Sequence, residues 1–395
     1  MYSARAAAPW AVLAVCAAFL WQFLTVTCNY QGNWSALFQT GSGLNLPPGR
    51  VFEGTYVFPG TLGFDGQFYR YVAHDPILTR GFDDYADFPR MRWSRILVPA
   101  LAHILAFGQQ AYIDAAYAGV LLGFLFLGVY WLSAWFQQRG RHPAWGLMFL
   151  LVPAVLISIE RLTIDLALLA LCTGFALHAE KASWKTYAIL ALAPLVRDTG
   201  IFLAGAYFLF RLRKRDWRSA GLAVIACVPF GVWSWFVYTN VPASPIRWDV
   251  YFPAYPLRGI LLRTFYPPLP WNQTELKQAI AGSLDYLALI GIWAALVFAV
   301  RLLWKAKRGP LEIAIGLFTL LALILANMPT WGEAYSFGRY LSPLLLWLTM
   351  DGVVTRRAYL VVPLGLVVLR VLAQVTPQTL GIMSGLLGGR MDLGF

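Results

Sequence analysis

Acidic, basic and aromatic side chains that could carry out a reaction gather between residues 63 and 95. Asp65 lies in the sequence Gly63-Phe-Asp-Gly-Gln, just before an aromatic run. Burial beside hydrocarbon raises the pKa of a carboxyl group, and a raised pKa suits a carboxylate to general-base catalysis. The alternative is that Asp65 caps the helix that follows it. Asp65 is our candidate for a catalytic base.

Polar side chains recur at helical spacing after this acid. Gln67, Arg70 and His74 stand at positions i, i+3 and i+7, which share one face of a helix. That face is either solvated or turned toward a substrate, and Gln67 is a candidate for substrate binding. Tyr69 offers a ring for stacking on a sugar, and packing in an interfacial aromatic belt is the alternative.

Three arginines end the polar segment. Arg90, Arg92 and Arg95 precede or begin the apolar stretch that runs to residue 107. Arginine at a membrane surface either reaches lipid headgroups or grips a phosphate through two parallel hydrogen bonds. The segment is expected on the external face, where basic residues are less common. Arg92 and Arg95 are therefore candidate phosphate ligands, with headgroup anchoring as the alternative.

An acidic cluster precedes these arginines. Asp83, Asp84 and Asp87 could hold a divalent cation through carboxylate oxygens, which hard cations prefer. A solvated loop explains the same pattern. A divalent cation is thus a candidate cofactor, and the sequence establishes none.

Ionisable residues also interrupt apolar segments further along the chain. The pairs Glu160-Arg161 and Arg197-Asp198 could each neutralise themselves, whereas Asp165 has no partner nearby in the sequence. Charged groups at membrane depth are costly and often mark functional sites. We therefore take Asp165 and Arg197 as candidate substrate ligands.

A late polar segment, 331–340, leads directly into an apolar helix. Arg339 at its end could reach a lipid-linked phosphate. Tyr335, and Trp331 before it, offer rings for stacking. Arg339 and Tyr335 complete the set of candidate substrate ligands.

The composition explains why these polar residues stand out. The chain of 395 residues is 59% hydrophobic and 13% charged, and its mean hydropathy is +0.60. Soluble domains carry about 25% charged residues, so the composition predicts an all-α polytopic membrane protein with one domain over 1–395. The net charge of +12 falls in short clusters between apolar runs. Such clusters are typical of cytoplasmic loops and argue against nucleic-acid binding.

Apolar runs predict about ten or eleven membrane-spanning helices. They lie near residues 10–28, 113–136, 144–159, 162–179, 186–209, 219–238, 284–304, 311–328, 339–352 and 358–375. The basic segment 211–218 is expected in the cytoplasm. Counting outward from it places two long loops, 29–93 and 239–283, together on the external face. In a bacterial inner membrane that face would be the periplasmic one.

The region 94–210 admits two arrangements. Segment 94–107 would be only about 21 Å long as a helix, so we expect it at the outer interface beside the helices of the first loop. Residues 184–210 must then form two half-helices that meet near 196–200 and line a polar cavity. In the alternative, 94–107 crosses the membrane and 186–209 is one continuous span.

This arrangement resembles the GT-C superfamily of membrane glycosyltransferases. The sequence Gly63-Phe-Asp-Gly-Gln-Phe-Tyr takes the place of that family's acidic motif in the first external loop. The run 190–200 looks like its helix break with a basic residue, and Tyr335-Ser-Phe-Gly-Arg-Tyr looks like a late external motif. The likeness covers the layout of the whole chain through short motifs. Many members carry two adjacent acids in the first loop, whereas this chain has Asp65 alone.

The resemblance implies inverting transfer of a sugar from a polyprenyl-phosphate carrier to a glycan, lipid or protein acceptor at the external membrane face. Asp65 would deprotonate the acceptor hydroxyl. Arg339, with one or more of Arg92, Arg95 and Arg197, would stabilise charge on the leaving phosphate. Aromatic residues of the two long loops would stack on sugar rings; they are Tyr69, Tyr71, Trp248, Tyr251 and Trp271.

Two other functions fit the same composition. A lipid-linked glycan polymerase, ligase or flippase shares the apolar bulk and the external loops, and a polymerase would use external arginines without a loop carboxylate. A secondary transporter would show inverted repeats and ionisable groups near the midplane of the bilayer. No repeat is visible in this sequence, and its polar residues gather on the external side.

Overall fold

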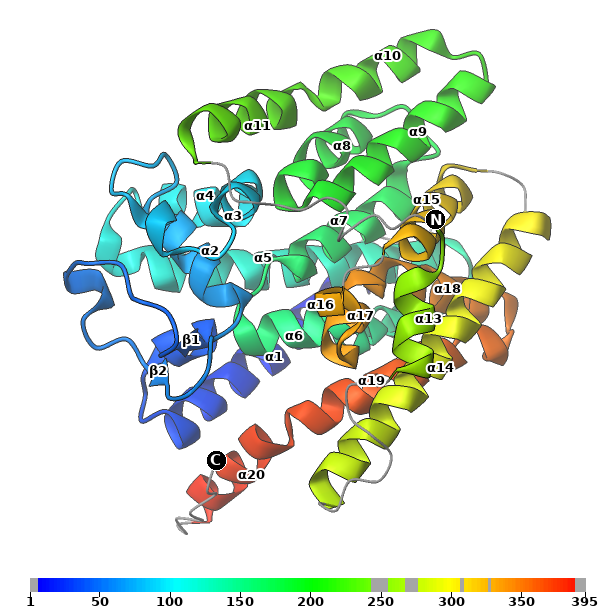
Figure 1. Cartoon of the computed structure of the whole chain (residues 1–395). Helices are drawn as coiled ribbons and strands as arrows, with labels where there is room; N and C mark the ends of the chain where they lie inside the picture. The colour runs from blue at the N-terminus through cyan, green and yellow to red at the C-terminus, as the bar shows by residue number, and fades with distance from the viewer. Residues whose placement is uncertain (1–5, 243–254, 267–275, 306–308, 326–327, 388–395) are drawn as a thin grey trace.

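The structure is a computed structural model that describes residues 6–242, 255–266, 276–305, 309–325 and 328–387. Helices make up nearly all of the regular structure in these ranges (Figure 1). The strands described are two residues long, with β1 (Thr40–Gly41) paired in parallel with β2 (Val57–Phe58). The fold is that of an all-α polytopic membrane protein, as the composition predicts.

Within the described ranges, four helices are long and apolar enough to cross a bilayer by themselves. The number rises to as many as six if each of two bent helix pairs crosses as one unit. The four are α1 (Ala8–Asn29), α5 (Gln110–Gln138), α10 continued by α11 (Trp217–Ala226 and Val228–Asn240) and α14 (Leu276–Lys305). They coincide with the spans predicted near 10–28, 113–136, 219–238 and 284–304.

The bent pairs and shorter helices account for the remaining apolar runs. The span predicted near 144–159 is broken, because η5 (Pro143–Leu151) and α6 (Pro153–Arg161) meet at a 64° bend where Pro153 begins a new helix. The run after 358 forms η7 (Ala358–Leu360) and α19 (Val362–Gln374), followed by a 49° bend into α20 (Thr376–Leu386). The shorter apolar helices are α7 (Asp165–His178), α8 (Trp184–Val196), α15 (Pro310–Ile324) and α18 (Ser342–Thr355).

The helix break expected near 196–200 is confirmed. After α8 the backbone is extended at Arg197, and η6 (Asp198–Gly200) leads into α9 (Ile201–Arg213). Gly200 permits this close return, because a Cβ at that position would lie 2.2 Å from the backbone of Ala193. The alternative of one continuous helix over 186–209 is wrong.

Segment 94–107 starts and ends on one side of the bundle. Its helix, α4 (Leu97–Leu105), is nine residues long and too short to cross a bilayer. Asp114 near the start of α5 contacts Arg70 at 2.7 Å and His74 at 3.0 Å, and both partners belong to α2 (Asp65–His74) in the first loop. The chain thus enters α5 at the same end of the bundle as the first loop. This agrees with the arrangement in which 94–107 lies at the outer interface and does not cross the membrane.

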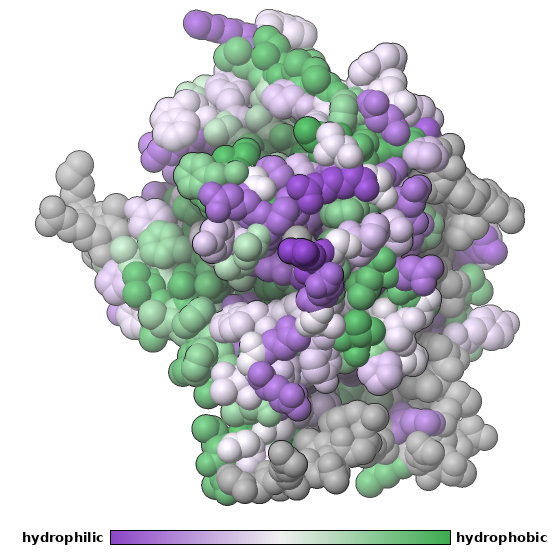
Figure 2. Space-filling model, turned by 90° about the vertical axis from the view of Figure 1, so that its left-hand side faces the viewer, coloured by the Kyte–Doolittle hydropathy of each residue, from purple (hydrophilic) through white to green (hydrophobic). Residues whose placement is uncertain are grey.

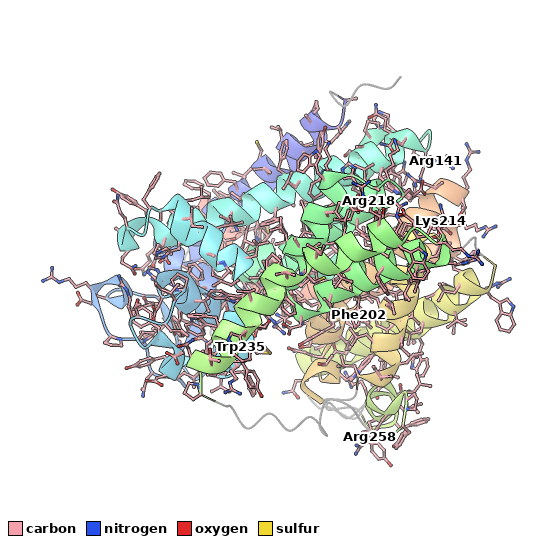
Figure 3. All side chains as sticks on the ribbon, turned by 90° about the horizontal axis from the view of Figure 1, so that it is seen from above. Arg141, Phe202, Lys214, Arg218, Trp235 and Arg258 are labelled. Carbon is pink, nitrogen blue, oxygen red and sulfur yellow. The ribbon has the colours of Figure 1, made fainter. Side chains whose placement is uncertain are left out.

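Residues 29–93 form a folded cap on one end of the helical bundle, which we call the loop end. Besides β1, β2 and α2, the cap contains η2 (Trp34–Phe38), η3 (Arg50–Phe52), η4 (Phe82–Tyr85) and α3 (Pro89–Ser94). Hydrophilic side chains gather on this face (Figure 2). Arg141, Lys214 and Arg218 lie at the opposite end, which we call the basic end (Figure 3).

The second long loop, 239–283, is described in part. Its helix α13 (Arg258–Phe265) packs near α16 (Met328–Trp331), and the Leu257 amide donates to the carbonyl of Leu323 at 2.5 Å. The expected stacking residues Trp248, Tyr251 and Trp271 lie outside the described residues. A short helix, α17 (Ala334–Tyr340), follows α16 and carries Arg339.

Candidate functional site

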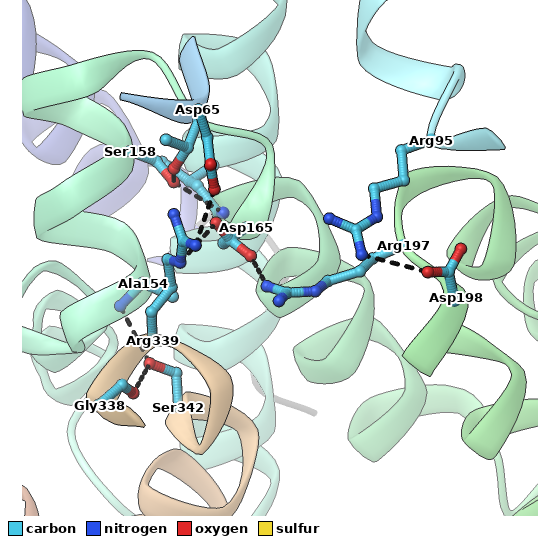
Figure 4. A network of polar contacts seen from close by, with 12 residues as sticks. Asp65, Arg95, Ala154, Ser158, Asp165, Arg197, Asp198, Gly338, Arg339 and Ser342 are labelled. Carbon is cyan, nitrogen blue, oxygen red and sulfur yellow. Dashed lines mark hydrogen bonds and ion pairs between the residues drawn. The ribbon is translucent and has the colours of Figure 1, made fainter. Parts of the chain in front are cut away.

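Asp65 is held by two arginines from distant parts of the chain. Its Oδ1 accepts a hydrogen bond from Nη2 of Arg92 on α3 at 2.9 Å. Its Oδ2 lies 2.7 Å from Nη2 of Arg339 on α17 (Figure 4). The two sequence motifs that contain Asp65 and Arg339 therefore meet in one site. Asp65 is the first residue of α2, and the N-cap residue of this helix is Phe64. The Asp65 side chain therefore does not cap the helix. The capping alternative is therefore wrong.

The charge state of Asp65 differs from the expectation. Burial by itself raises its pKa, but the guanidinium groups of Arg339 and Arg92 outweigh burial and hold the pKa well below its ordinary value. The expected raised pKa is therefore wrong for this state of the protein. Asp65 is an ionised carboxylate that can accept a proton, but its basicity is reduced while both arginines remain in contact.

A second acid continues the chain of charges. Asp165, the first residue of α7, lies with Oδ2 at 3.4 Å from Nε of Arg339, and its Oδ1 accepts a hydrogen bond from Nη1 of Arg197 (Figure 4). Arg197 also stacks over the ring of Tyr340, at 4.1 Å from its centroid. Asp165 has no charged partner nearby in the sequence, and the fold brings two arginines to it.

Arg92 and Arg95 turn inward rather than toward lipid. Arg92 makes a two-bond contact with Asp87, with both N–O distances at 2.8 Å. Arg95 donates from Nη1 to the Tyr69 hydroxyl at 3.1 Å and from Nη2 to Asp198 at 3.1 Å. Both arginines are buried, so the headgroup-anchoring alternative is wrong for them. Asp198 pairs with Arg95, so the expected self-neutralisation of Arg197 by Asp198 is also wrong.

Three arginines of the site keep N–H donors without an acceptor. Among the described residues, Nε of Arg95, Nη2 of Arg197 and Nη1 of Arg339 are buried and make no hydrogen bond. A buried unsatisfied donor costs about 1–3 kcal/mol. An anion that reached these donors would satisfy them. The cavity beside Asp165, Arg197 and Arg339 has only about 10 Å³, about enough for a single water, so a phosphate would have to displace side chains to enter.

The remaining candidate residues are buried and hydrogen-bond to other protein groups around the site. Gln67 is fully buried, donates to the Leu62 carbonyl at 2.8 Å and accepts from the Gly41 amide at 3.3 Å. Tyr69 is buried and orients Arg95 through its hydroxyl. Tyr335 is buried and its hydroxyl donates to Glu160. Their rings and amide hold protein groups in place and present no free face to a ligand.

Glu160 and Arg161 behave differently from each other. Glu160 accepts from Tyr335 and, at 3.0 Å, from Gln378 of α20. Arg161 lies 3.9 Å from Glu160 and stacks at 4.5 Å over the rings of both Phe64 and Tyr335. The pair is thus loosely self-neutralised, as expected, and it connects the segment next to Asp65 with α17.

The three acids that could have held a cation do not form a metal site in the described structure. Asp87 is bound to Arg92, and Asp84 is exposed. Within the described ranges no group of three or more His, Cys, Asp or Glu side chains is arranged to hold a metal ion. A divalent cation therefore has no identified protein site here.

Two acids that the sequence reading missed fix the elements around the site. Asp114 joins α5 to Arg70 and His74 of α2. Asp285 of α14 accepts hydrogen bonds from the Ala334 amide at 3.2 Å and from Arg370 at 3.0 Å. Both acids interrupt apolar runs of the sequence, and a charged residue in such a run was the sign that could have identified them.

Neither protein-family models, curated proteins nor solved structures match this chain. Its function is therefore inferred from the geometry of the site.

Proposed function

We propose that this protein is a membrane glycosyltransferase that moves a sugar from a polyprenyl-phosphate carrier to an acceptor hydroxyl, with inversion at the anomeric carbon. The observation that carries the proposal is the contact of one loop carboxylate, Asp65, with Arg92 and Arg339 beside further buried arginines. An acid next to unsatisfied guanidinium donors supplies a proton acceptor and a phosphate site within one cluster.

In the proposed reaction the acceptor oxygen forms a bond to the anomeric carbon and its proton passes to Asp65. The bond between the anomeric carbon and the phosphate oxygen breaks on the opposite side. Its electron pair leaves on the phosphate, which gains one negative charge. The free donors of Arg339, Arg197 and Arg95 would stabilise that charge, because preorganised donors cost no reorganisation at the moment of reaction.

The ion pairs of Asp65 suggest how donor binding would activate the base. A phosphate that takes up hydrogen bonds from Arg339 would weaken the contact of that arginine with Asp65. The pKa of a carboxyl group rises when an opposite charge is withdrawn or shared with another anion. Asp65 would therefore become a stronger base in the donor complex than in the free protein.

The proposal includes a topology of ten or eleven spans in a GT-C-like bundle. The loop end would face the periplasm of a bacterial inner membrane and the basic end the cytoplasm. That orientation is supported by the positions of Arg141, Lys214 and Arg218, which lie at the end opposite the first loop (Figure 3). A glycan, lipid or protein would approach the loop end as acceptor.

The test is turnover by purified full-length protein supplied with radiolabelled polyprenyl-phosphate sugars and candidate acceptors. The Asp65→Asn variant should lose transfer by about 10²-fold or more, the scale expected for a lost general base. Asp84→Asn changes an exposed acid of the same loop and should remain fully active. Thermal unfolding of each variant separates loss of chemistry from loss of structure.

One alternative is favoured by a specific observation. Asp65 already makes two ion pairs, so it could be a structural counter-ion in an arginine-based polymerase, ligase or flippase of lipid-linked glycans. Full activity of a folded Asp65→Asn variant would support that alternative. Absence of turnover by the parent protein with every polyprenyl-phosphate sugar would also favour it, or a secondary transporter.

A further inference from the structure

A second cavity lies at the basic end, away from Asp65. It has a volume of about 590 Å³ and is enclosed by the ends of α5, α7, α14 and α18 and by the first turns of α15. Small-molecule sites usually have about 300–1,000 Å³. None of the charged residues around Asp65 lines it, so it is independent of the proposed transferase site.

Two indole N–H groups in this cavity wall have no acceptor. Trp135 is 3% exposed and Trp347 is 1% exposed, and Nε1 of each makes no hydrogen bond to the described residues. Buried indole N–H groups usually find a partner, because burying a donor without one is costly. Both N–H groups are covered by protein atoms, so a bound molecule that carries acceptor oxygens would accept hydrogen bonds from them once the two rings turn toward the cavity.

Charged groups of both signs surround the same space without pairing with one another. Three arginines and three carboxylates line it, and no ion pair within 4.0 Å joins any two of them in the described structure. They are Arg139, Arg301, Arg357, Glu180, Glu312 and Asp351. Equal numbers of the two charges give a polyanion such as a nucleotide little net attraction, whereas a molecule with one anionic and one cationic group can be matched by both sets.

Apolar side chains complete the wall and indicate an amphiphile. Leu302, Leu311 and Val354 line the cavity together with the rings of Phe175 and Phe298. The helices that enclose it carry exposed apolar side chains, such as Val297 and Val300 of α14, that suit contact with lipid chains. A molecule with a charged headgroup and hydrocarbon tails could reach the cavity from the bilayer.

We propose that this cavity binds the phosphoethanolamine group of a zwitterionic phospholipid. The phosphate would accept hydrogen bonds from Trp135, Trp347 and Arg139, and the ammonium group would lie against Glu180, Glu312 and Asp351. No covalent step is involved. A phospholipid and free phosphoethanolamine both carry this headgroup chemistry, and the experiment below distinguishes the two sources.

Native mass spectrometry of delipidated full-length protein tests the proposal. The protein is titrated with phosphatidylethanolamine and with phosphatidylglycerol, which has the phosphate but lacks the amine. Phosphatidylethanolamine should bind about tenfold more tightly, the difference expected for losing one hydrogen-bonded charge contact. Soluble phosphoethanolamine is added as a competitor to distinguish a headgroup bound by itself from one that requires its lipid tails.

Three variants locate the binding. Arg139→Gln and Glu180→Gln should each weaken phosphatidylethanolamine binding about tenfold, and Trp347→Phe, which keeps a ring but removes the N–H, should weaken it several-fold. Arg218→Gln is the control, because Arg218 lies at the same end (Figure 3) and does not line the cavity. If a charge variant unfolds, Trp347→Phe decides the result.

Equal binding of the two lipids, or parent-like binding by the lining variants, would overturn the proposal. Selective and variant-sensitive binding supports it. Competition by phosphoethanolamine would then assign recognition to the headgroup alone, and lack of competition would assign it to the whole lipid.

Discussion

The guanidinium group of Arg339 contacts Asp65 at 2.7 Å, although one residue lies in the first loop and the other on a helix near the end of the chain. The same guanidinium lies 3.4 Å from Asp165. Arg339 therefore joins the cap, α7 and α17 through one side chain. Any change that moves α17 also changes the charge around Asp65.

Replacing Arg339 should affect catalysis more than folding. We expect Arg339→Gln to lower transfer by about 10²–10³-fold, because it removes a donor aimed at the developing charge. Arg339→Lys should restore only part of the rate, because lysine cannot make the two contacts in fixed geometry. Arg80→Gln, at an exposed arginine of the same cap, is the control. An unchanged kcat/KM for Arg339→Gln would contradict the proposed role.

Asp285 should act as a positioning residue for Arg339. It accepts the amide of Ala334 at the start of α17 and holds Arg370. Asp285→Asn should lower transfer about tenfold. A bound donor analogue should also protect Arg339 from guanidine-modifying reagents less well in this variant than in the parent. Asp216→Asn exchanges one helix-capping residue for another at the basic end and should change neither transfer nor this protection. Parent-like protection in Asp285→Asn would contradict positioning.

The pH dependence follows from the lowered pKa of Asp65. A carboxyl group whose pKa is depressed by folding stabilises the folded state above its ordinary pKa of about 3.9 and loses that contribution as pH falls through the folded value. The difference in thermal stability between the parent and Asp65→Asn should therefore be constant from about pH 7 to 5 and shrink below about pH 4. A difference that vanishes already near pH 6 would contradict the ion-paired state.

Kinetic pH profiles test whether the donor activates Asp65. In the free protein its pKa is held low by Arg339 and Arg92, so kcat/KM should show no acidic limb from Asp65 above about pH 5. If donor phosphate withdraws Arg339, the acidic limb of kcat should move upward, because kcat reports the bound state. Identical limbs in both profiles would leave no role for donor-dependent activation.

Gly66 should be essential for docking α2 on α6. A Cβ at this position would lie 2.2 Å from the carbonyl oxygen of Arg161. Gly66→Ala should destabilise the protein by about 1–3 kcal/mol and shift Asp65, since overpacking forces the backbone apart. Gly119→Ala in α5 meets no atom within 4 Å and should be neutral or slightly stabilising. Thermal unfolding compares the two, and equal stability would contradict the tight contact.

Composition and periodicity were enough to predict an all-α membrane protein, because a run of apolar residues has few ways to avoid water. The break at 196–200 was also predictable, since Arg197 and Asp198 cannot lie in an unbroken lipid-facing helix. Asp65 and Arg339 stood out for the same reason, as charged groups in a chain where charge is scarce.

The tertiary structure alone decided which charge meets which. Arg197 pairs with Asp165 rather than its neighbour Asp198, and Asp198 pairs with Arg95. The pKa of Asp65 is lowered rather than raised because two arginines from distant segments reach it. Burial of one residue follows from its local sequence, but the field at its carboxylate is set by groups that only folding brings within a few ångströms.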